Sequence, residues 1–118
     1  MKVLAKRGAK SAIGWLEPDA THLVLAVSSV PSKGSRYLLW SEKQQSVALF
    51  PASDFEIVDP NMSPVWVASV DLNGYLELSP QEWLTDGFWE RFHEGDPKAV
   101  TILRKGIEAI KKQDSGAP

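Results

Sequence analysis

The two histidines are the only side chains of this chain that could act as imidazole bases. Nucleophilic catalysis requires a nucleophile, a base and a group that orients the base. His22 begins a predicted strand, where a half-exposed sheet residue is its ordinary role. His93 lies near a predicted helix C-terminus, where the helix dipole favours an imidazole. Neither histidine has the neighbours of a catalytic base, so we expect no catalytic residues and a protein that is not an enzyme.

Metal binding is the second chemistry that the residue types allow. Glu90, His93 and Glu94 are spaced i, i+3 and i+4, so they can share one face of a helix. Acidic helices produce such triplets by chance, and a solvated charged face is the ordinary role of this spacing. The chain has no cysteine, which excludes disulfides and thiolate-bound metal. We expect no metal ion and no cofactor.

Surface recognition remains, and carboxylates are the residues that would provide it. Asp86, Glu90 and Glu94 recur every four residues, so they would line one side of a continuous helix, although aligned like charges slightly lower helix stability. Trp83 and Trp89 lie beside them, and an aromatic centre with an acidic rim would suit a basic protein partner. Tryptophans at helical spacing also form ordinary cores. The predicted partner-binding residues are Glu82, Asp86, Glu90, Glu94, Asp96, Asp54, Glu56 and Asp59.

Charge is distributed unevenly along the chain. Residues 1–43 contain seven Lys or Arg against three acids, residues 44–97 contain one Arg against ten acids, and residues 98–118 contain five bases against two acids. The segment charges are therefore +4, −9 and +3, within a formal net charge of −2. An acidic middle segment repels nucleic acid and attracts basic surfaces, so we expect no nucleic-acid partner. Acids also keep small domains soluble, which is the alternative explanation.

Length and composition indicate one ordinary globular domain. A chain of 118 residues with 43% hydrophobic and 24% charged residues can form one core without disulfides or metal. No apolar run reaches the roughly 20 residues of a membrane span, and no apolar segment of secretory length follows the basic N-terminus. We expect a cytoplasmic protein with no membrane association, organised as one domain over residues 1–112 and a disordered tail over residues 113–118.

The spacing of apolar residues predicts strands first and helices last, which favours the α+β class. Strands are expected at 2–6, as an edge strand, and at 22–30, 36–42, 46–50 and 55–58. Their short turns predict a small antiparallel sheet, strongly bent, or an SH3-like barrel. Asn73-Gly74 between apolar runs at 65–72 and 75–78 predicts a β-hairpin with a type I′ turn.

Helices are expected after the hairpin. Ser79, Pro80 and Glu82 match a capping box, which predicts a helical turn over residues 80–85. A second helix is expected over 87–94. Asp96-Pro97 predicts the N-terminus of a third helix, in which Gly106 costs about 1 kcal/mol relative to alanine.

The arrangement of aromatic and acidic residues between positions 36 and 97 is similar to that of a known protein set. The pattern is Leu49-Phe50, Asp54-Phe55-Glu56-Ile57-Val58-Asp59, Pro64-x-Trp66-Val67, Gly74-x-Leu76-x-Leu78-x-Pro80, Trp83 and Gly87-Phe88-Trp89-Glu90. It resembles small bacterial immunity proteins of polymorphic-toxin and contact-dependent growth inhibition loci. The resemblance covers about half of the chain and implies a cognate toxin domain as partner. Such toxins are often basic nucleases, and the immunity protein covers their active or substrate-binding surface.

Two other functions stay open at this point. A small-ligand-binding or regulatory domain would have a concave pocket lined by Trp40, Trp66 or Trp15 and would need no protein partner. A scaffold subunit would form a homodimer through an exposed strand edge.

Overall fold

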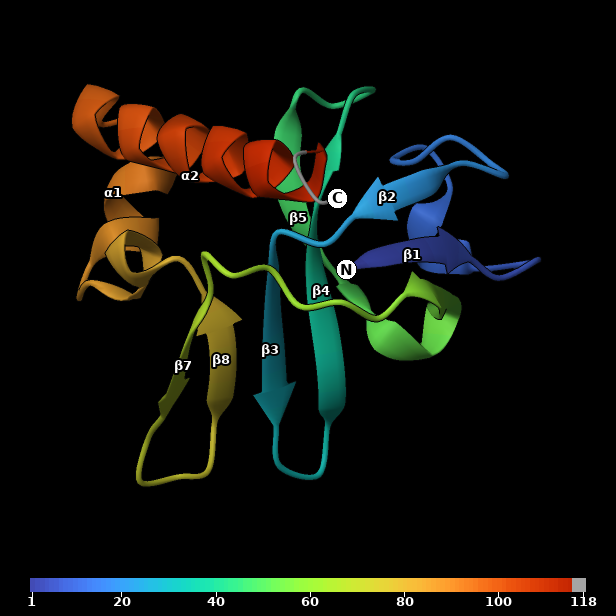
Figure 1. Ribbon diagram of the computed structural model, residues 1–118, viewed down its shortest axis with the longest axis horizontal. Coiled ribbons are helices and arrows are strands. Elements are labelled where there is room, and N and C mark those ends of the chain that lie inside the picture. Colours follow the sequence, from blue (N-terminus) through green and yellow to red (C-terminus); the bar gives the residue numbers. More distant parts are fainter. Residues whose placement is uncertain (116–118) are drawn as a thin grey trace.

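Two antiparallel sheets and two C-terminal helices make up the fold in the computed structural model, which describes residues 1–115 (Figure 1). The strands are β1 (Lys2–Ala5), β2 (Thr21–Leu23), β3 (Ala26–Val30), β4 (Gly34–Ser41), β5 (Ser46–Pro51), β6 (Phe55–Asp59), β7 (Val67–Val70) and β8 (Leu76–Ser79). The α-helices are α1 (Phe88–His93) and α2 (Pro97–Ser115), and short 3-10 helices are η1 (Lys10–Ala12), η2 (Ala52–Asp54) and η3 (Gln81–Leu84). The predicted α+β class is confirmed.

The smaller sheet has the strand order β2-β1-β6. Lys2 lies opposite Leu23 on one neighbour and opposite Asp59 on the other. The first strand is therefore the middle strand of its sheet, and the prediction of an edge strand is wrong. The lysines at both ends of residues 2–6 suggested a protected edge, whereas pairing with β6 from 50 residues away determines the position of the strand.

The larger sheet has the order β5-β4-β3-β8-β7. The predicted strand over residues 22–30 contributes to both sheets, because the chain passes from one to the other at Val24 and Leu25. The Val24 amide donates to the Met1 carbonyl at 2.9 Å, and the Leu25 amide donates to the Leu38 carbonyl at 2.9 Å. Within the described residues the pairings form two separate antiparallel sheets and no closed barrel, so the structure does not show the predicted SH3-like alternative.

Strand β4 separates two hydrophobic cores. Its residues Tyr37 and Leu39 are buried in the core between the two sheets, which also contains Val3, Ala12, Leu16, Val24, Phe50 and Phe55. Leu38, which lies between these two residues in the sequence, is buried in the other core, under the helices. That core also contains Leu25, Val47, Trp83, Phe88, Ala99, Leu103, Ile107 and Ile110. Successive side chains of a strand point to opposite faces, so one strand contributes to both cores. The molecule therefore has three layers, with the larger sheet in the middle (Figure 1).

The predicted β-hairpin is confirmed as β7 and β8, and β8 joins it to β3. Its turn differs from the type I′ prediction, since Gly74 alone has positive φ, at 83°, and Asn73 does not. The Asp71 carboxylate explains the difference, because it accepts the amides of Asn73 at 2.8 Å and Tyr75 at 3.1 Å. These bonds favour a longer loop with glycine at its left-handed position. All four residues of β7, the outer strand, are exposed.

The capping box predicted at Ser79 is absent. Ser79 is the buried last residue of β8, and its hydroxyl donates to the Pro80 carbonyl at 3.1 Å, so it caps no helix. The segment that follows is the 3-10 helix η3, which lacks a side-chain cap. Residues 76–79 pair in the sheet, and this pairing prevents the helix start that the local sequence predicts.

None of the helices within residues 1–115 combines the length and the apolar character of a membrane-spanning segment.

The remaining helix predictions are confirmed in position. Helix α1 begins after Gly87, whose φ of 77° interrupts the chain between η3 and α1. The Asp96 carboxylate accepts the Lys98 amide at 3.0 Å and caps α2, as predicted. Helix α2 continues to Ser115, three residues into the predicted tail, and residues 116–118 lie outside the described part of the chain.

Candidate functional site

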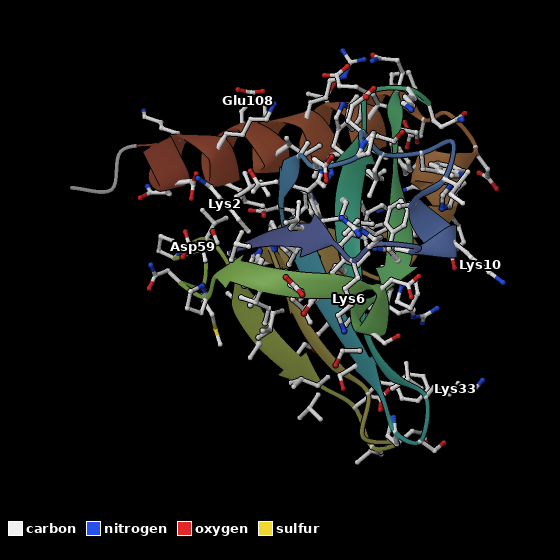
Figure 2. The ribbon with its side chains drawn as sticks, turned by 90° about the vertical axis from the view of Figure 1, so that its right-hand side faces the viewer. Lys2, Lys6, Lys10, Lys33, Asp59 and Glu108 are labelled. Carbon is white, nitrogen blue, oxygen red and sulfur yellow. The ribbon has the colours of Figure 1, made fainter. Side chains whose placement is uncertain are left out.

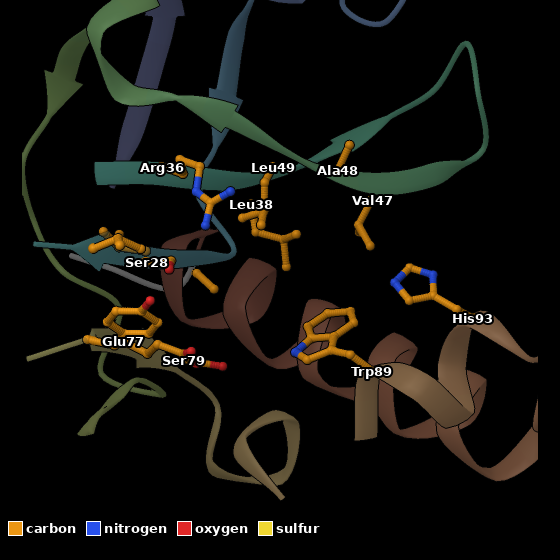
Figure 3. A pocket seen from close by; sticks show the side chains of 14 residues that line it. Ser28, Arg36, Leu38, Val47, Ala48, Leu49, Glu77, Ser79, Trp89 and His93 are labelled. Carbon is orange, nitrogen blue, oxygen red and sulfur yellow. The ribbon is translucent and has the colours of Figure 1, made fainter. Parts of the chain in front are cut away.

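A pocket of about 480 Å³ lies on the face of the larger sheet that α1 partly covers (Figure 3). We call it the sheet pocket. Its lining comes from β3, β4, β5, the β7–β8 hairpin and α1, namely Ala26, Val27, Ser28, Val30, Arg36, Leu38, Val47, Ala48, Leu49, Tyr75, Glu77, Ser79, Trp89 and His93. Small-molecule sites typically have volumes of about 300–1,000 Å³, mostly apolar walls and a few polar groups.

The pocket lies where the larger sheet extends beyond the helices that cover it. In Figure 1, the β3–β4 and β7–β8 hairpins project beyond α1 and α2. At the covered end, Leu38 and Val47 are buried under the helices, and Trp89 closes the pocket from α1. At the uncovered end, the same sheet face continues without a covering element, so polar side chains can occupy it.

Three polar residues form one row across that uncovered end. Ser28 on β3 pairs with Arg36 on β4 and with Glu77 on β8. All three line the sheet pocket, and Figure 3 shows the Arg36 guanidinium directed into it. Within residues 1–115, neither Arg36 nor Glu77 forms a side-chain hydrogen bond or an ion pair. An unpaired cation and an unpaired anion therefore face each other across an apolar floor.

Five of the predicted partner-binding carboxylates gather around α1. We call Glu82, Asp86, Glu90, Glu94 and Asp96 the α1 carboxylate group. All are exposed except Asp96, which is half-buried. They do not line one continuous helix, because η3 ends at Leu84 and α1 begins only at Phe88. The predicted four-residue repeat is therefore broken, although the exposed segments are adjacent in the chain.

One cation lies within this group. Arg91 donates to the Asp86 carbonyl at 3.2 Å, and its Nε lies 4.0 Å from the Asp96 carboxylate. Glu82, Glu90 and Glu94 make no side-chain hydrogen bond or ion pair within the described residues. These three carboxylates face solvent, and they are the residues best placed to meet a basic partner.

The other three predicted carboxylates lie elsewhere, on β6 and η2. Asp54 accepts the Ser11 hydroxyl at 2.7 Å, and Asp59 accepts the Asn61 amide at 3.0 Å. Asp59 also lies opposite Lys2 in the β1–β6 pairing, and Figure 2 shows Lys2, Lys6 and Asp59 on the same side of the molecule. This surface contains both signs of charge.

The eight carboxylates therefore do not form one surface. Helix α1 and the small sheet containing β1 lie at opposite sides of the view in Figure 1. The α1 carboxylate group retains an acidic character, whereas Asp59 lies on the same side of the molecule as Lys2 of β1 and the adjacent Lys6. The candidate acidic interface is thus limited to α1 and its flanking segments.

The tryptophans expected to line a ligand pocket do not line the sheet pocket. Trp66 is half-buried, and its indole donates to the Leu25 carbonyl at 2.8 Å. Trp40 packs beside the core under the helices. Trp15 packs edge-on against Phe50, with ring centroids 6.2 Å apart. Trp89, from the acidic segment, is the tryptophan in the pocket wall.

His22 lies half-buried on β2, away from the sheet pocket, and its Nε2 is buried without a hydrogen-bond partner in the described structure. Burial lowers the pKa of His22 below its usual value, and a smaller opposite effect comes from a backbone hydrogen bond with Glu17. His93 is exposed and contributes to the pocket rim. Residues 1–115 contain no group of three His, Asp or Glu side chains that could hold a metal ion.

The pKa of His22 makes stability depend on pH. The unfolded chain, with a histidine pKa of about 6.5, binds a proton more readily than the folded chain. The free energy of unfolding should therefore fall as pH drops below about 6.5, and this contribution should be absent above that pH. Urea unfolding at about pH 7.5 and about pH 5.5 measures the fall. His22→Gln should reduce the fall, and an equal fall in His22→Gln and in the wild-type protein would refute the assignment.

The residues of the polar row were missed by sequence analysis. Arg36 begins the predicted strand over residues 36–42, and Glu77 lies inside the predicted strand over 75–78, so each has an ordinary local explanation. Their alignment through Ser28 depends on the register between strands about 40 residues apart. The one local signal is an acid within the apolar segment Tyr75–Leu78.

Comparison of this chain with models of protein families, with curated proteins and with solved structures found no match. The resemblance of residues 36–97 to immunity proteins therefore stays a prediction.

Proposed function

We propose that this protein is a non-catalytic binding protein of the immunity type. It binds a basic bacterial toxin domain and neutralises it by covering the active or substrate-binding surface. The observation that supports the proposal is the α1 carboxylate group, in which Glu82, Glu90 and Glu94 are exposed and unpaired within the described residues. The sequence resemblance supports the same function.

Electrostatics explains how such a surface would act. Residues 79–97 carry five acids against Arg91, so this part of the molecule has a local excess of negative charge. Complementary charges accelerate encounter by about 10- to 1,000-fold and are screened by salt. They contribute more to the association rate than to the lifetime of the complex when they lie at the rim of an interface. An inhibitor must reach its toxin quickly, which this arrangement favours.

The test uses the basic domain encoded beside this gene, produced as an inactive variant. Mixed with the protein, it should elute as a 1:1 complex, and its active form should arrest growth unless this protein is co-expressed. The triple variant Glu82→Gln, Glu90→Gln, Glu94→Gln should reduce the association rate constant about tenfold or more at low salt. Stopped-flow fluorescence measures that rate.

The matched control is Glu17→Gln, Glu42→Gln, Glu108→Gln, which changes net charge equally at exposed positions outside the α1 carboxylate group. At about 0.1 M salt, where exposed charges beyond a Debye length of about 10 Å are screened, it should retain the association rate within about twofold, while the triple variant of the α1 carboxylate group stays slower. Equal effects of the two triple variants would contradict the assignment of the surface. A neighbouring domain that forms no complex, or causes no growth arrest, would contradict the proposed function.

The sheet pocket favours a second candidate function, the binding of a small ligand. Its volume of about 480 Å³ and apolar floor are typical of ligand sites. Toxin binding would occur at exposed carboxylates around α1, whereas ligand binding would occur between α1 and the sheet. Variants of the two surfaces therefore separate the candidates.

A further inference from the structure

The sheet pocket presents two opposite charges that the protein itself leaves unpaired. Arg36 and Glu77 lie on either side of Ser28, on strands β4 and β8, with β3 between them. Neighbouring strands are about 4.8 Å apart, so the two backbones are separated by about 10 Å. No ion pair connects the two side chains within the described structure. The space between them is open to a ligand.

The floor beneath this row is apolar. Leu38 is buried on β4, Leu49 is half-exposed beside it on β5, and Trp89 closes the far end from α1. Figure 3 shows Arg36, Leu38 and Leu49 on one side of the pocket and Trp89 opposite them. An aliphatic or aromatic group placed here would cover apolar surface, which is favourable by about 25 cal/mol per Å².

Charge decides which ligand fits. A purely apolar ligand would cover Arg36 and Glu77 without pairing them, which carries a desolvation cost. A simple anion would meet repulsion from Glu77, and a simple cation would meet repulsion from Arg36. A ligand that carries both charges satisfies both side chains, since guanidinium groups bind carboxylates in bidentate geometry and carboxylates accept from ammonium groups.

We propose that the sheet pocket binds a small zwitterion of the amino-acid type with an apolar side chain. Its carboxylate pairs with Arg36, its ammonium group pairs with Glu77, and its side chain lies on Leu38, Leu49 and Trp89. This inference rests on the second candidate function, because it names the ligand class of the same pocket. It does not depend on the toxin partner.

Three probes that share a benzyl side chain test the inference. L-phenylalanine carries both charges, N-acetyl-L-phenylalanine carries the carboxylate alone, and L-phenylalaninamide carries the ammonium group alone. Titrations at about pH 6, below the α-amino pKa of about 8, keep the amines protonated. The wild-type protein should bind phenylalanine at least about tenfold more tightly than either derivative, measured by amide NMR shifts of Ser28, Arg36 and Glu77.

Two variants test which side chain binds each charged group of the ligand. Arg36→Gln should lower the affinity for phenylalanine to that for phenylalaninamide, because the carboxylate then has no partner. Glu77→Gln should lower it to that for N-acetylphenylalanine. The controls Arg104→Gln and Glu108→Gln, at exposed positions of α2, should leave all three affinities unchanged. Folding of each variant is checked by its amide NMR spectrum.

The possible outcomes distinguish failure of the zwitterion proposal from failure of ligand binding in general. Equal affinity for all three probes would overturn the proposal of a zwitterionic ligand. The pocket would then bind ligands through apolar contacts, without selecting for charge. Absence of binding by all three would overturn both this inference and the ligand-binding function. Neither result bears on the complex with a basic domain, which the carboxylate variants test.

Discussion

Replacing Trp83 by alanine should lower the free energy of unfolding by about 3–5 kcal/mol, the usual cost of deleting a buried indole. Trp83 is 1% exposed and lies in the core under the helices. Its ring packs edge-on against Trp89, with centroids 6.0 Å apart, and its Nε1 lies 3.5 Å from the Ile102 carbonyl of α2. One side chain thus joins η3, α1 and α2, so its removal leaves a cavity where three elements meet.

Urea unfolding followed by circular dichroism measures this loss. The matched control is Trp15→Ala, because Trp15 is 37% exposed and contacts Phe50 at the edge of the other core. Its loss should be about 1 kcal/mol, which is ordinary for a substitution outside the core. Similar losses for the two variants would show that Trp83 does not hold the helices together.

Replacing Gly106 by alanine should destabilise the protein by about 1–3 kcal/mol, the usual cost of overpacking a core. Helix propensity alone predicts the opposite sign, a gain of about 1 kcal/mol. A Cβ at position 106 would lie 2.5 Å from Cζ2 and 2.8 Å from Nε1 of Trp83. These atoms belong to a buried ring that cannot move without displacing its neighbours, so the steric cost exceeds the propensity gain.

A double-mutant cycle identifies the cause of that loss. In a Trp83→Leu background the ring is absent, and Gly106→Ala should then cost little or become stabilising. Lys105→Ala, at an exposed position of the same helix, is the control and should change the unfolding free energy by less than about 0.5 kcal/mol. An equal cost of Gly106→Ala in both backgrounds would contradict contact with the indole as the cause.

Gly106 also shows why some features follow from sequence and others do not. Helix α2 was predictable because the apolar spacing and the Asp96-Pro97 start are local signals, and its glycine looked like a weakness. The reason for the glycine is a tryptophan 23 positions earlier, which no local pattern connects to it. The hairpin was likewise predictable from Asn73-Gly74, whereas its turn type depended on the Asp71 carboxylate.

Tertiary pairing overrode the local signals that gave wrong predictions. Ser79, Pro80 and Glu82 fit a helix start, yet Ser79 is held in the sheet as the end of β8. Lysines at both ends of residues 2–6 fit an edge strand, yet the first strand lies between β2 and β6. In both cases a partner distant in the sequence determined the outcome, and the pattern within a few residues carried no information about it.

The candidate site also has residues that the sequence predicted and residues that it did not. The sequence identified the carboxylates of residues 82–96 because their number and spacing are local, and the structure shows them exposed around α1, apart from the half-buried Asp96. It did not predict that Asp54, Glu56 and Asp59 would lie elsewhere, on η2 and β6. It also did not predict the row of Arg36, Ser28 and Glu77, because strand register across three segments creates it.

The position of strand β4 between the two cores determines how the protein unfolds. The strand contributes Tyr37 and Leu39 to one core and Leu38 to the other, so neither core can lose this strand and stay intact. The N-terminal strands and the C-terminal helices would therefore unfold in a single concerted transition, and Trp66, which packs against both cores, and the Lys2–Asp114 ion pair add to this coupling. A substitution that weakens packing under the helices should therefore lower the hydrogen-exchange protection of the small sheet as well. This loss should occur by global unfolding and not by local opening of the helices.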